Sequence, residues 1–145
     1  MSTRVTPGSG ALFRPSFNSV YGVSGIEVLD GGAGYAKAAG NYGAAFYPTS
    51  IAISKGFDQI VWTDSSTHQK IEEVGTMSVV FRINDKLITP LTSDTILDGV
   101  TRKSVIQVAR DIGIEVEERD ITVKELISEF KSGNLKEVFG CGTAA

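Results

Sequence analysis

The sequence predicts an α+β domain in which helices cover a mainly antiparallel or mixed sheet. Several short β-prone segments follow one another between Gln59 and Thr89, separated by connections of only a few residues. Such connections favour antiparallel pairing, because parallel neighbours need a crossover of about a dozen residues or more. Two segments with helical periodicity follow, at 100–112 and 122–131. We expect the helices to cover one face of the sheet.

The N-terminal part of the chain lacks a sustained pattern. It is rich in Gly, Pro and Ser, and we expect short strands there only at Ala11–Arg14 and Gly25–Leu29. A glycine cluster beginning at Gly31 indicates either a backbone that bends tightly or approaches a ligand, or a flexible loop. We therefore divide the chain into an irregular segment over 1–30 and one domain over 31–145.

A first helix is predicted over Asn41–Lys55, and Gly56 suits its end. Pro48 lies inside this segment and is expected to kink or delay the helix. The apolar residues available for one face of this helix are Ala44, Ala45, Tyr47, Ile51 and Ala52.

The later elements follow from alternating apolar residues and turn signals. The expected strands are Gln59–Thr63, Lys70–Glu73, Met77–Ile83, Leu87–Thr89, Ile114–Glu118 and Glu137–Phe139. The apolar positions of the helix over 100–112 are Val105, Ile106, Val108, Ala109 and Ile112. Thr122 and Glu125 form a capping box for the helix that ends at Lys131.

Composition and charge exclude several classes of function. The net charge is −3 and basic residues form no stripe, so we expect no nucleic-acid partner. No apolar run approaches the roughly 20 residues that cross a bilayer, so we expect no membrane span. Cys141 and His68 are the single cysteine and histidine, which argues against a metal site of Cys/His type and excludes an intramolecular disulfide.

Three features of the sequence could carry chemistry. Lys37 lies among small apolar residues, where partial desolvation would lower its pKa and free a nucleophilic amine; the alternative is a solvated loop lysine. Glu73 precedes Val-Gly-Thr between two strands and either points into a cavity or is exposed. Thr101 stands at a helix start, where it either helps to bind an anion or caps the helix.

Five separated motifs together resemble branched-chain aminotransferases, which are pyridoxal-phosphate enzymes of fold type IV. In chain order the motifs are GGAGYAKAAGNY, EEVGTM, ILDGVTRKSVI, GIEVEER and KEVFGCGTAA. The resemblance covers about residues 31–145 and implies a pyridoxal-phosphate domain like that of D-amino-acid aminotransferase. It also implies transamination of leucine, isoleucine or valine with 2-oxoglutarate, in a cytoplasmic homodimer or, in a eukaryote, a mitochondrial one.

The resemblance assigns the cofactor contacts residue by residue. Lys37 would form the aldimine with pyridoxal phosphate and shuttle the proton in catalysis. Tyr42 would donate a hydrogen bond to the cofactor's phenolic oxygen, and Glu73 would pair with its pyridine nitrogen. Leu97 would pack on the ring. The phosphate would be held by Val100, Thr101 and Thr143.

The same resemblance places Thr76 and Ala144 near the substrate carboxylate. Because adjacent strand residues point to opposite sides, we expect Glu73 to face the cofactor and Glu72 to face solvent. The motifs also depart from the family pattern. Ser78 stands where asparagine is usual, and Asp98 replaces a proline.

The family's small domain and the strands after its Gly-Thr-Ala-Ala segment have no counterpart in the sequence. We therefore expect a domain truncated at both ends, with weak cofactor binding and little turnover on its own. Two alternatives stay open. One is a related fold-type IV enzyme, such as D-amino-acid aminotransferase or aminodeoxychorismate lyase. The other is an inactive remnant.

Overall fold

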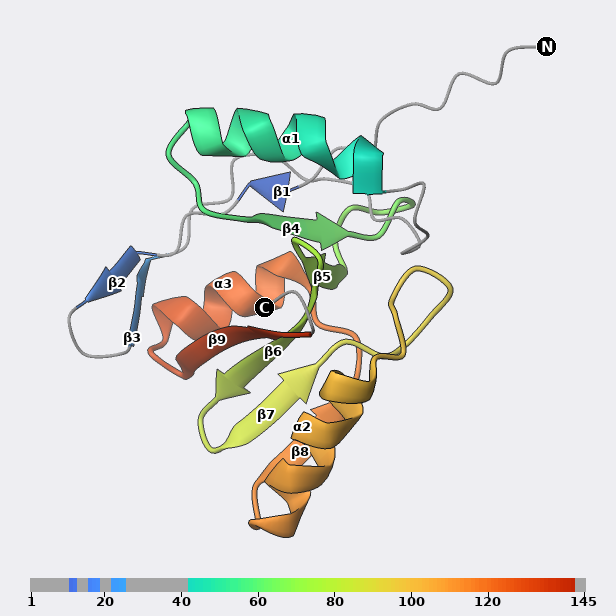
Figure 1. Cartoon of the computed structure of the whole chain (residues 1–145). Coiled ribbons are helices and arrows are strands. Elements are labelled where there is room, and N and C mark those ends of the chain that lie inside the picture. The colour runs from blue at the N-terminus through green and yellow to red at the C-terminus, as the bar shows by residue number, and fades with distance from the viewer. Residues whose placement is uncertain (1–10, 13–15, 19–21, 26–41, 143–145) are drawn as a thin grey trace.

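A computed structural model of the chain describes residues 11–12, 16–18, 22–25 and 42–142. Three helices and nine strands lie within these ranges (Figure 1). In chain order they are β1 (Ala11–Leu12), β2 (Ser16–Asn18), β3 (Gly22–Gly25), α1 (Tyr42–Ser54), β4 (Ile60–Thr63), β5 (Ile71–Val74), β6 (Met77–Ile83), β7 (Lys86–Thr89), α2 (Val100–Asp111), β8 (Glu115–Glu118), α3 (Val123–Lys131) and β9 (Leu135–Cys141). The predicted α+β class is confirmed.

Seven strands form one mixed sheet. Its order is β1-β4-β5-β6-β7-β8, and β9 pairs with β6. All neighbours are antiparallel except β7 and β8, which are parallel. Helix α2 makes the crossover that a parallel pair requires. The expected antiparallel run between Gln59 and Thr89 is therefore confirmed. Strands β2 and β3 form a separate two-stranded sheet.

Strand β6 forks the sheet. Along one edge it pairs first with β5, through Met77 and Ser78, and then with β7, through Phe81–Ile83. Strand β9 pairs with the other edge of β6, from Ser78 to Ile83. Between the two branches, the Thr89 hydroxyl donates a hydrogen bond to the Val79 carbonyl across 2.8 Å. The loop after β7 therefore leaves the sheet beside β5.

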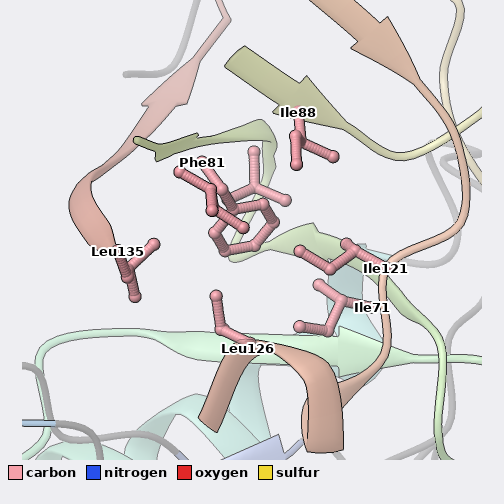
Figure 2. Close-up of a cluster of buried hydrophobic side chains, with 8 residues drawn as sticks. Ile71, Phe81, Ile88, Ile121, Leu126 and Leu135 are labelled. Carbon is pink, nitrogen blue, oxygen red and sulfur yellow. The ribbon is translucent and has the colours of Figure 1, made fainter. Parts of the chain in front are cut away.

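The helices lie on both faces of the sheet, so the expectation that they cover one face is wrong. Alternate residues of β6 pack on different helices, because successive side chains of a strand point to opposite faces. Val79 and Phe81 belong to a cluster with Leu126 of α3 (Figure 2), whereas Val80 packs in a cluster with Ala109 of α2. Periodicity reveals that a helix has an apolar side but not which face that side covers.

Helix α1 packs on β4 through the side that carries Ala52. Ala52 is fully buried in a cluster with Ile60 and Trp62, on the side of β4 opposite to α3. The helix begins at Tyr42 and runs through Pro48, so the proline does not delay it. Tyr47, expected on the buried side, is 67% exposed, and the large apolar side chains of Phe46 and Ile53 are exposed as well.

The other helices fit their predicted ranges closely. Ile106 and Ala109 of α2 are buried as expected, but Val108 and Ile112 are exposed. Helix α3 is capped by Thr122, whose hydroxyl accepts from the Glu125 backbone N–H at 3.1 Å. Among the described residues, no helix combines the length and the apolar character that a membrane span requires.

Candidate functional site

A row of four buried side chains crosses the sheet on the face that α1 and α2 cover. The pairing registers place Trp62 of β4 beside Glu73 of β5, Glu73 beside Ser78 of β6, and Ser78 beside Cys141 of β9. All four side chains are buried. Directly opposite residues on neighbouring strands have Cβ atoms about 5 Å apart, so this row brings a carboxylate, a hydroxyl and a thiol together.

The start of α2 lies over this row. Gly99 is the N-cap residue, and no side chain caps the helix there. A Cβ atom built on Gly99 would lie 4.0 Å from the Ser78 hydroxyl oxygen. The first N–H groups of a helix lack intrahelical partners and carry the positive end of the helix dipole. The site therefore combines an uncapped helix start, a feature to which anions can bind, with a buried carboxylate, that of Glu73.

The first turn of α2 contains two of the residues that the motif assigns to the phosphate. Val100 and Thr101 are the first two residues of the helix, so Thr101 does not serve as its N-cap. The side chain of Val100 is 81% exposed and that of Leu97 is half exposed. Asp98 pairs with Lys103 across 2.5 Å, which offsets the negative charge that it brings to an anion site.

Both glutamates of β5 face the loop over 92–98. The Leu97 backbone N–H donates to Glu73 Oε1 at 3.4 Å, and the Thr95 hydroxyl donates to Glu72 Oε1 at 2.7 Å. Glu73 is 3% exposed and Glu72 is 9% exposed, so the expectation that Glu72 faces solvent is wrong. The reason is a register shift where β4 pairs with β5, between Trp62 and Thr63. Such a bulge breaks the simple alternation of sides.

Thr76 is half buried in the turn between β5 and β6. The indole Nε1 of Trp62 donates to the Gly75 carbonyl at 2.8 Å and so fixes this turn against β4. Gly75 has φ of 57°, and a Cβ atom there would lie 2.3 Å from the amide oxygen of Gln59. The turn therefore needs glycine, and Thr76 is held at the edge of the buried row.

Several predicted site residues are not placed by the structure. Lys37, Thr143 and Ala144 lie outside the described residues. Tyr42 is the first residue of α1, and the structure describes its backbone but not its side chain. Of the predicted site residues, the structure shows Glu73 bonded to Leu97. It places Val100 and Thr101 at the start of α2, which follows Leu97, and Thr76 in the turn after β5.

Arg102 is a residue of this site that the sequence analysis missed. Its side chain is 2% exposed, and its Nη2 donates to the Pro90 carbonyl at 2.8 Å and to Glu118 at 3.0 Å. These bonds tie the first turn of α2 to the ends of β7 and β8. The spacing 102, 106, 109 puts Arg102 on the same side of the helix as Ile106 and Ala109, and that signal could have found it.

The loop over 92–98 lines an open pocket of about 450 Å³, which includes Leu97 but neither Glu73 nor the first residues of α2. That volume lies within the usual range for pockets that bind small molecules. Within the described ranges, no three His, Cys, Asp or Glu side chains gather as a metal site would need.

Comparison with known proteins gives one consistent group. A family model described as amino-transferase class IV matches residues 34–145. The chain is 46% identical over 120 residues to a probable branched-chain-amino-acid aminotransferase of Staphylococcus epidermidis, covering 83% of this chain and 34% of that protein. The chain thus spans about a third of the length of the curated relatives that it matches.

Solved structures agree with this result. The branched-chain amino acid aminotransferase of Escherichia coli superposes with a TM-score of 0.65 at 26% identity, over 95% of this chain and 42% of that one. The pyridoxal-phosphate form of the branched-chain aminotransferase of Thermobaculum terrenum gives a TM-score of 0.61 at 33% identity, over 74% and 33%.

Proposed function

The chain belongs to the class IV aminotransferase family, and on that premise we propose that residues 31–145 form the cofactor-binding part of a branched-chain-amino-acid aminotransferase. Residues 1–30 would belong to, or lead into, the rest of such an enzyme. The observation that carries the proposal is the pairing of a buried carboxylate, Glu73, with the uncapped start of α2 over the same row of side chains. Pyridoxal phosphate needs both features, since it has a protonated ring nitrogen and a phosphate.

The described residues fit this cofactor in three ways. The Glu73 carboxylate would hold the proton on the pyridine nitrogen, and its burial would strengthen that interaction, because charges interact more strongly away from water. Leu97, half exposed at the edge of the loop, would pack on the ring. The backbone N–H groups of Val100 and Thr101, with the Thr101 hydroxyl, would bind the phosphate.

Residues whose side chains the structure does not describe complete the proposal. The ε-amine of Lys37 would hold the cofactor and move a proton between its C4′ atom and the substrate α-carbon. Tyr42 would donate to the phenolic oxygen, and Thr143 would add a phosphate contact. When bound, pyridoxal phosphate supplies a ring that withdraws electrons from the substrate α-carbon.

The substrates we propose are leucine, isoleucine or valine with 2-oxoglutarate, giving the 2-oxo acid and glutamate. The names of the relatives support this choice over other class IV enzymes. Thr76, at the edge of the buried row, and Ala144 would contact the substrate carboxylate. We propose that the enzyme acts as a homodimer in the cytoplasm, where a lone cysteine such as Cys141 stays reduced.

The decisive experiment is chemical labelling. The chain is incubated with pyridoxal phosphate, reduced with borohydride and digested, and the pyridoxyl-bearing peptide is identified by mass spectrometry. We expect the label on Lys37 and its loss in Lys37→Ala. A label on Lys55 or Lys70 instead would refute the assignment. A panel of L-leucine, D-alanine and aminodeoxychorismate then separates the branched-chain reaction from its relatives.

A further inference from the structure

Glu72 is a buried acid that the proposed cofactor contacts do not use. Its Oε1 accepts the hydroxyl hydrogen bond of Thr95, and its Oε2 is buried without a hydrogen-bond partner among the described residues. Burial raises the pKa of this carboxyl, against the opposing effect of the Thr95 hydrogen bond. Acids are rarely buried unless a partner compensates them, because their desolvation costs free energy.

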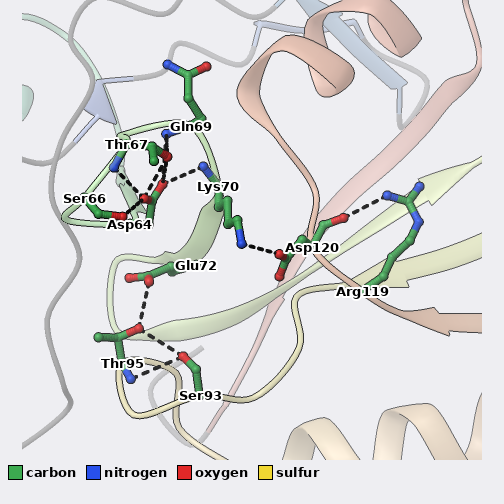
Figure 3. Close-up of polar contacts among 10 residues, drawn as sticks. All are labelled: Asp64, Ser66, Thr67, Gln69, Lys70, Glu72, Ser93, Thr95, Arg119 and Asp120. Carbon is green, nitrogen blue, oxygen red and sulfur yellow. Dashed lines mark hydrogen bonds and ion pairs between the residues drawn. The ribbon is translucent and has the colours of Figure 1, made fainter.

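Three hydrogen bonds link Ser93 and Thr95 of the loop over 92–98 to one another and to Glu72 (Figure 3). A threonine hydroxyl has one hydrogen, and that of Thr95 is given to Glu72. The bond of 3.0 Å between the Thr95 and Ser93 hydroxyls must then have Ser93 as its donor. The Thr95 backbone N–H in turn points back to the Ser93 oxygen at 3.3 Å. These bonds connect the Ser93 hydroxyl, through Thr95, to the carboxyl of Glu72.

The adjacent glutamates hold the same loop at alternate positions. Glu72 bonds Thr95, and Glu73 accepts from the backbone N–H of Leu97, two residues further on. Two residues after Leu97 comes Gly99, the N-cap of α2. The anchor at Thr95 therefore lies immediately upstream of the ring contact and the anion-binding helix start.

We propose that Glu72 is a positioning residue, which through Thr95 holds the loop over 92–98 against β5 so that Leu97 and the start of α2 keep their place beside Glu73. The role of the loop in placing cofactor contacts rests on the proposed function. The anchor, which is the hydrogen bond from Thr95 to Glu72, exists in the protein without cofactor. The role asks for an acceptor at Oε1 and not for a charge. Glu72→Gln and Thr95→Ser should therefore keep the hydrogen bond that anchors the loop.

Hydrogen exchange of the 145-residue chain without cofactor tests the anchor, read on peptides from the loop and, as an internal reference, from β6. Glu72→Ala and Thr95→Val remove the anchor, whereas Glu72→Gln and Thr95→Ser keep it. We expect exchange of the loop amides to become about tenfold faster in the first pair, because each of these changes removes the hydrogen bond that anchors the loop. The second pair should match the parent chain. Glu115→Gln, an exposed change on β8, is the matched control.

The proposal would be overturned if the loop amides of Thr95→Val exchanged as slowly as those of the parent chain. It would also be overturned if Thr95→Ser accelerated loop exchange as much as Thr95→Val does. If Glu72→Ala also loses protection in β6, it has unfolded, and the two Thr95 variants decide alone. Titration with pyridoxal phosphate, followed by absorbance, gives the second measurement. Thr95→Val should weaken binding about tenfold, while Thr95→Ser should not.

These measurements distinguish failure of the positioning role of Glu72 from failure of the proposed function. Binding that is equal in Thr95→Val and Thr95→Ser, despite a loosened loop, would overturn the positioning role. Absence of cofactor binding in every variant and in the parent chain would reject the proposed function and leave the exchange result to decide the anchor.

Discussion

Arg102 donates a hydrogen bond from its Nη2 to the Pro90 carbonyl across 2.8 Å and so closes the base of the loop that joins β7 to α2. The same nitrogen also donates to Glu118 at the end of β8. The loop is therefore fixed at its base by Arg102 and at its middle by Glu72. A buried arginine holds the helix start that we propose for the phosphate.

Arg102→Met should destabilise the fold by about 1–3 kcal/mol, because it leaves the buried Pro90 carbonyl without its donor and removes a partner of Glu118. Arg110→Met is the matched control, since Arg110 bonds the other oxygen of Glu118 from an exposed position. Its cost should stay below about 1 kcal/mol. Urea unfolding of both variants measures the difference, and equal costs would show that burial of Arg102 contributes nothing.

Local patterns predicted most elements of the fold. The alternation of apolar residues located β6 from Met77 to Ile83, and Thr122 located the start of α3. Strand β9 is longer than the predicted Glu137–Phe139, because its pairing with β6 extends past the residues with strong β propensity. Elements defined by their own residues can be found in one sequence, whereas bounds set by a partner strand cannot.

Residues of the candidate site could be predicted from the sequence only where a family motif included them. Strict alternation put Glu72 in solvent, and a bulge set by the pairing with β4 turns it inward instead. The face of each helix depends on how the connections cross the sheet, so periodicity could not show that α2 and α3 lie on opposite sides. Arg102 was not predicted to be buried, because charged side chains are usually exposed. Its spacing from Ile106, however, places both residues on the same buried side of α2.

Gly140→Ala should destabilise the sheet, because Met77 occupies the space where the new methyl group would stand. A Cβ atom on Gly140 would lie 2.8 Å from Met77 Sδ and 3.2 Å from Met77 Cβ, and the second contact cannot be relieved by turning the side chain end. We expect a loss of about 1–3 kcal/mol in urea unfolding. Adding Met77→Ala should recover part of it, so that the two changes are non-additive.

Gly142→Ala is the control for this prediction. The nearest atom to a Cβ there is Met77 Cα at 3.9 Å, an ordinary contact. Equal losses at the two glycines, or strict additivity with Met77→Ala, would contradict the steric explanation.

Asp64 should make the stability of the chain depend on pH in the acid range. Burial opposes ionisation of its carboxyl, but hydrogen bonds from the backbone N–H groups of Lys70 and Thr67 outweigh it and lower the pKa (Figure 3). A pKa lower in the folded than in the unfolded chain stabilises the fold above the unfolded value of about 3.9. That stabilisation is lost as the pH falls toward the folded pKa.

Asp64→Asn should therefore cost about 1 kcal/mol at pH 7, and the cost should shrink as the pH is lowered from 5 to 2. Urea unfolding across this range measures it. Asp85→Asn, at a fully exposed turn position, should show no such trend. A cost for Asp64→Asn that is the same at every pH would show that the ionised carboxylate is not what stabilises the turn.

The charge pair before α2 should tune anion binding at the proposed phosphate site. Asp98 precedes the N-cap, and Lys103 offsets its charge from the second turn of the helix. Lys103→Met leaves the carboxylate uncompensated beside the anion, so pyridoxal phosphate should bind about two- to fivefold more weakly, as expected for a charge near an exposed helix end. Asp98→Ala should strengthen binding by a similar factor, and the double variant should return close to the parent chain.

Titrations of pyridoxal phosphate at low ionic strength and in about 1 M salt measure the effect of this pair. The differences should shrink in high salt, because both side chains are more than half exposed and are readily screened. Lys136→Met, which removes an exposed lysine at the start of β9, should leave affinity unchanged. If Lys103→Met and Asp98→Ala moved affinity in the same direction, charge at the start of α2 would not govern binding, and the phosphate would have to lie elsewhere.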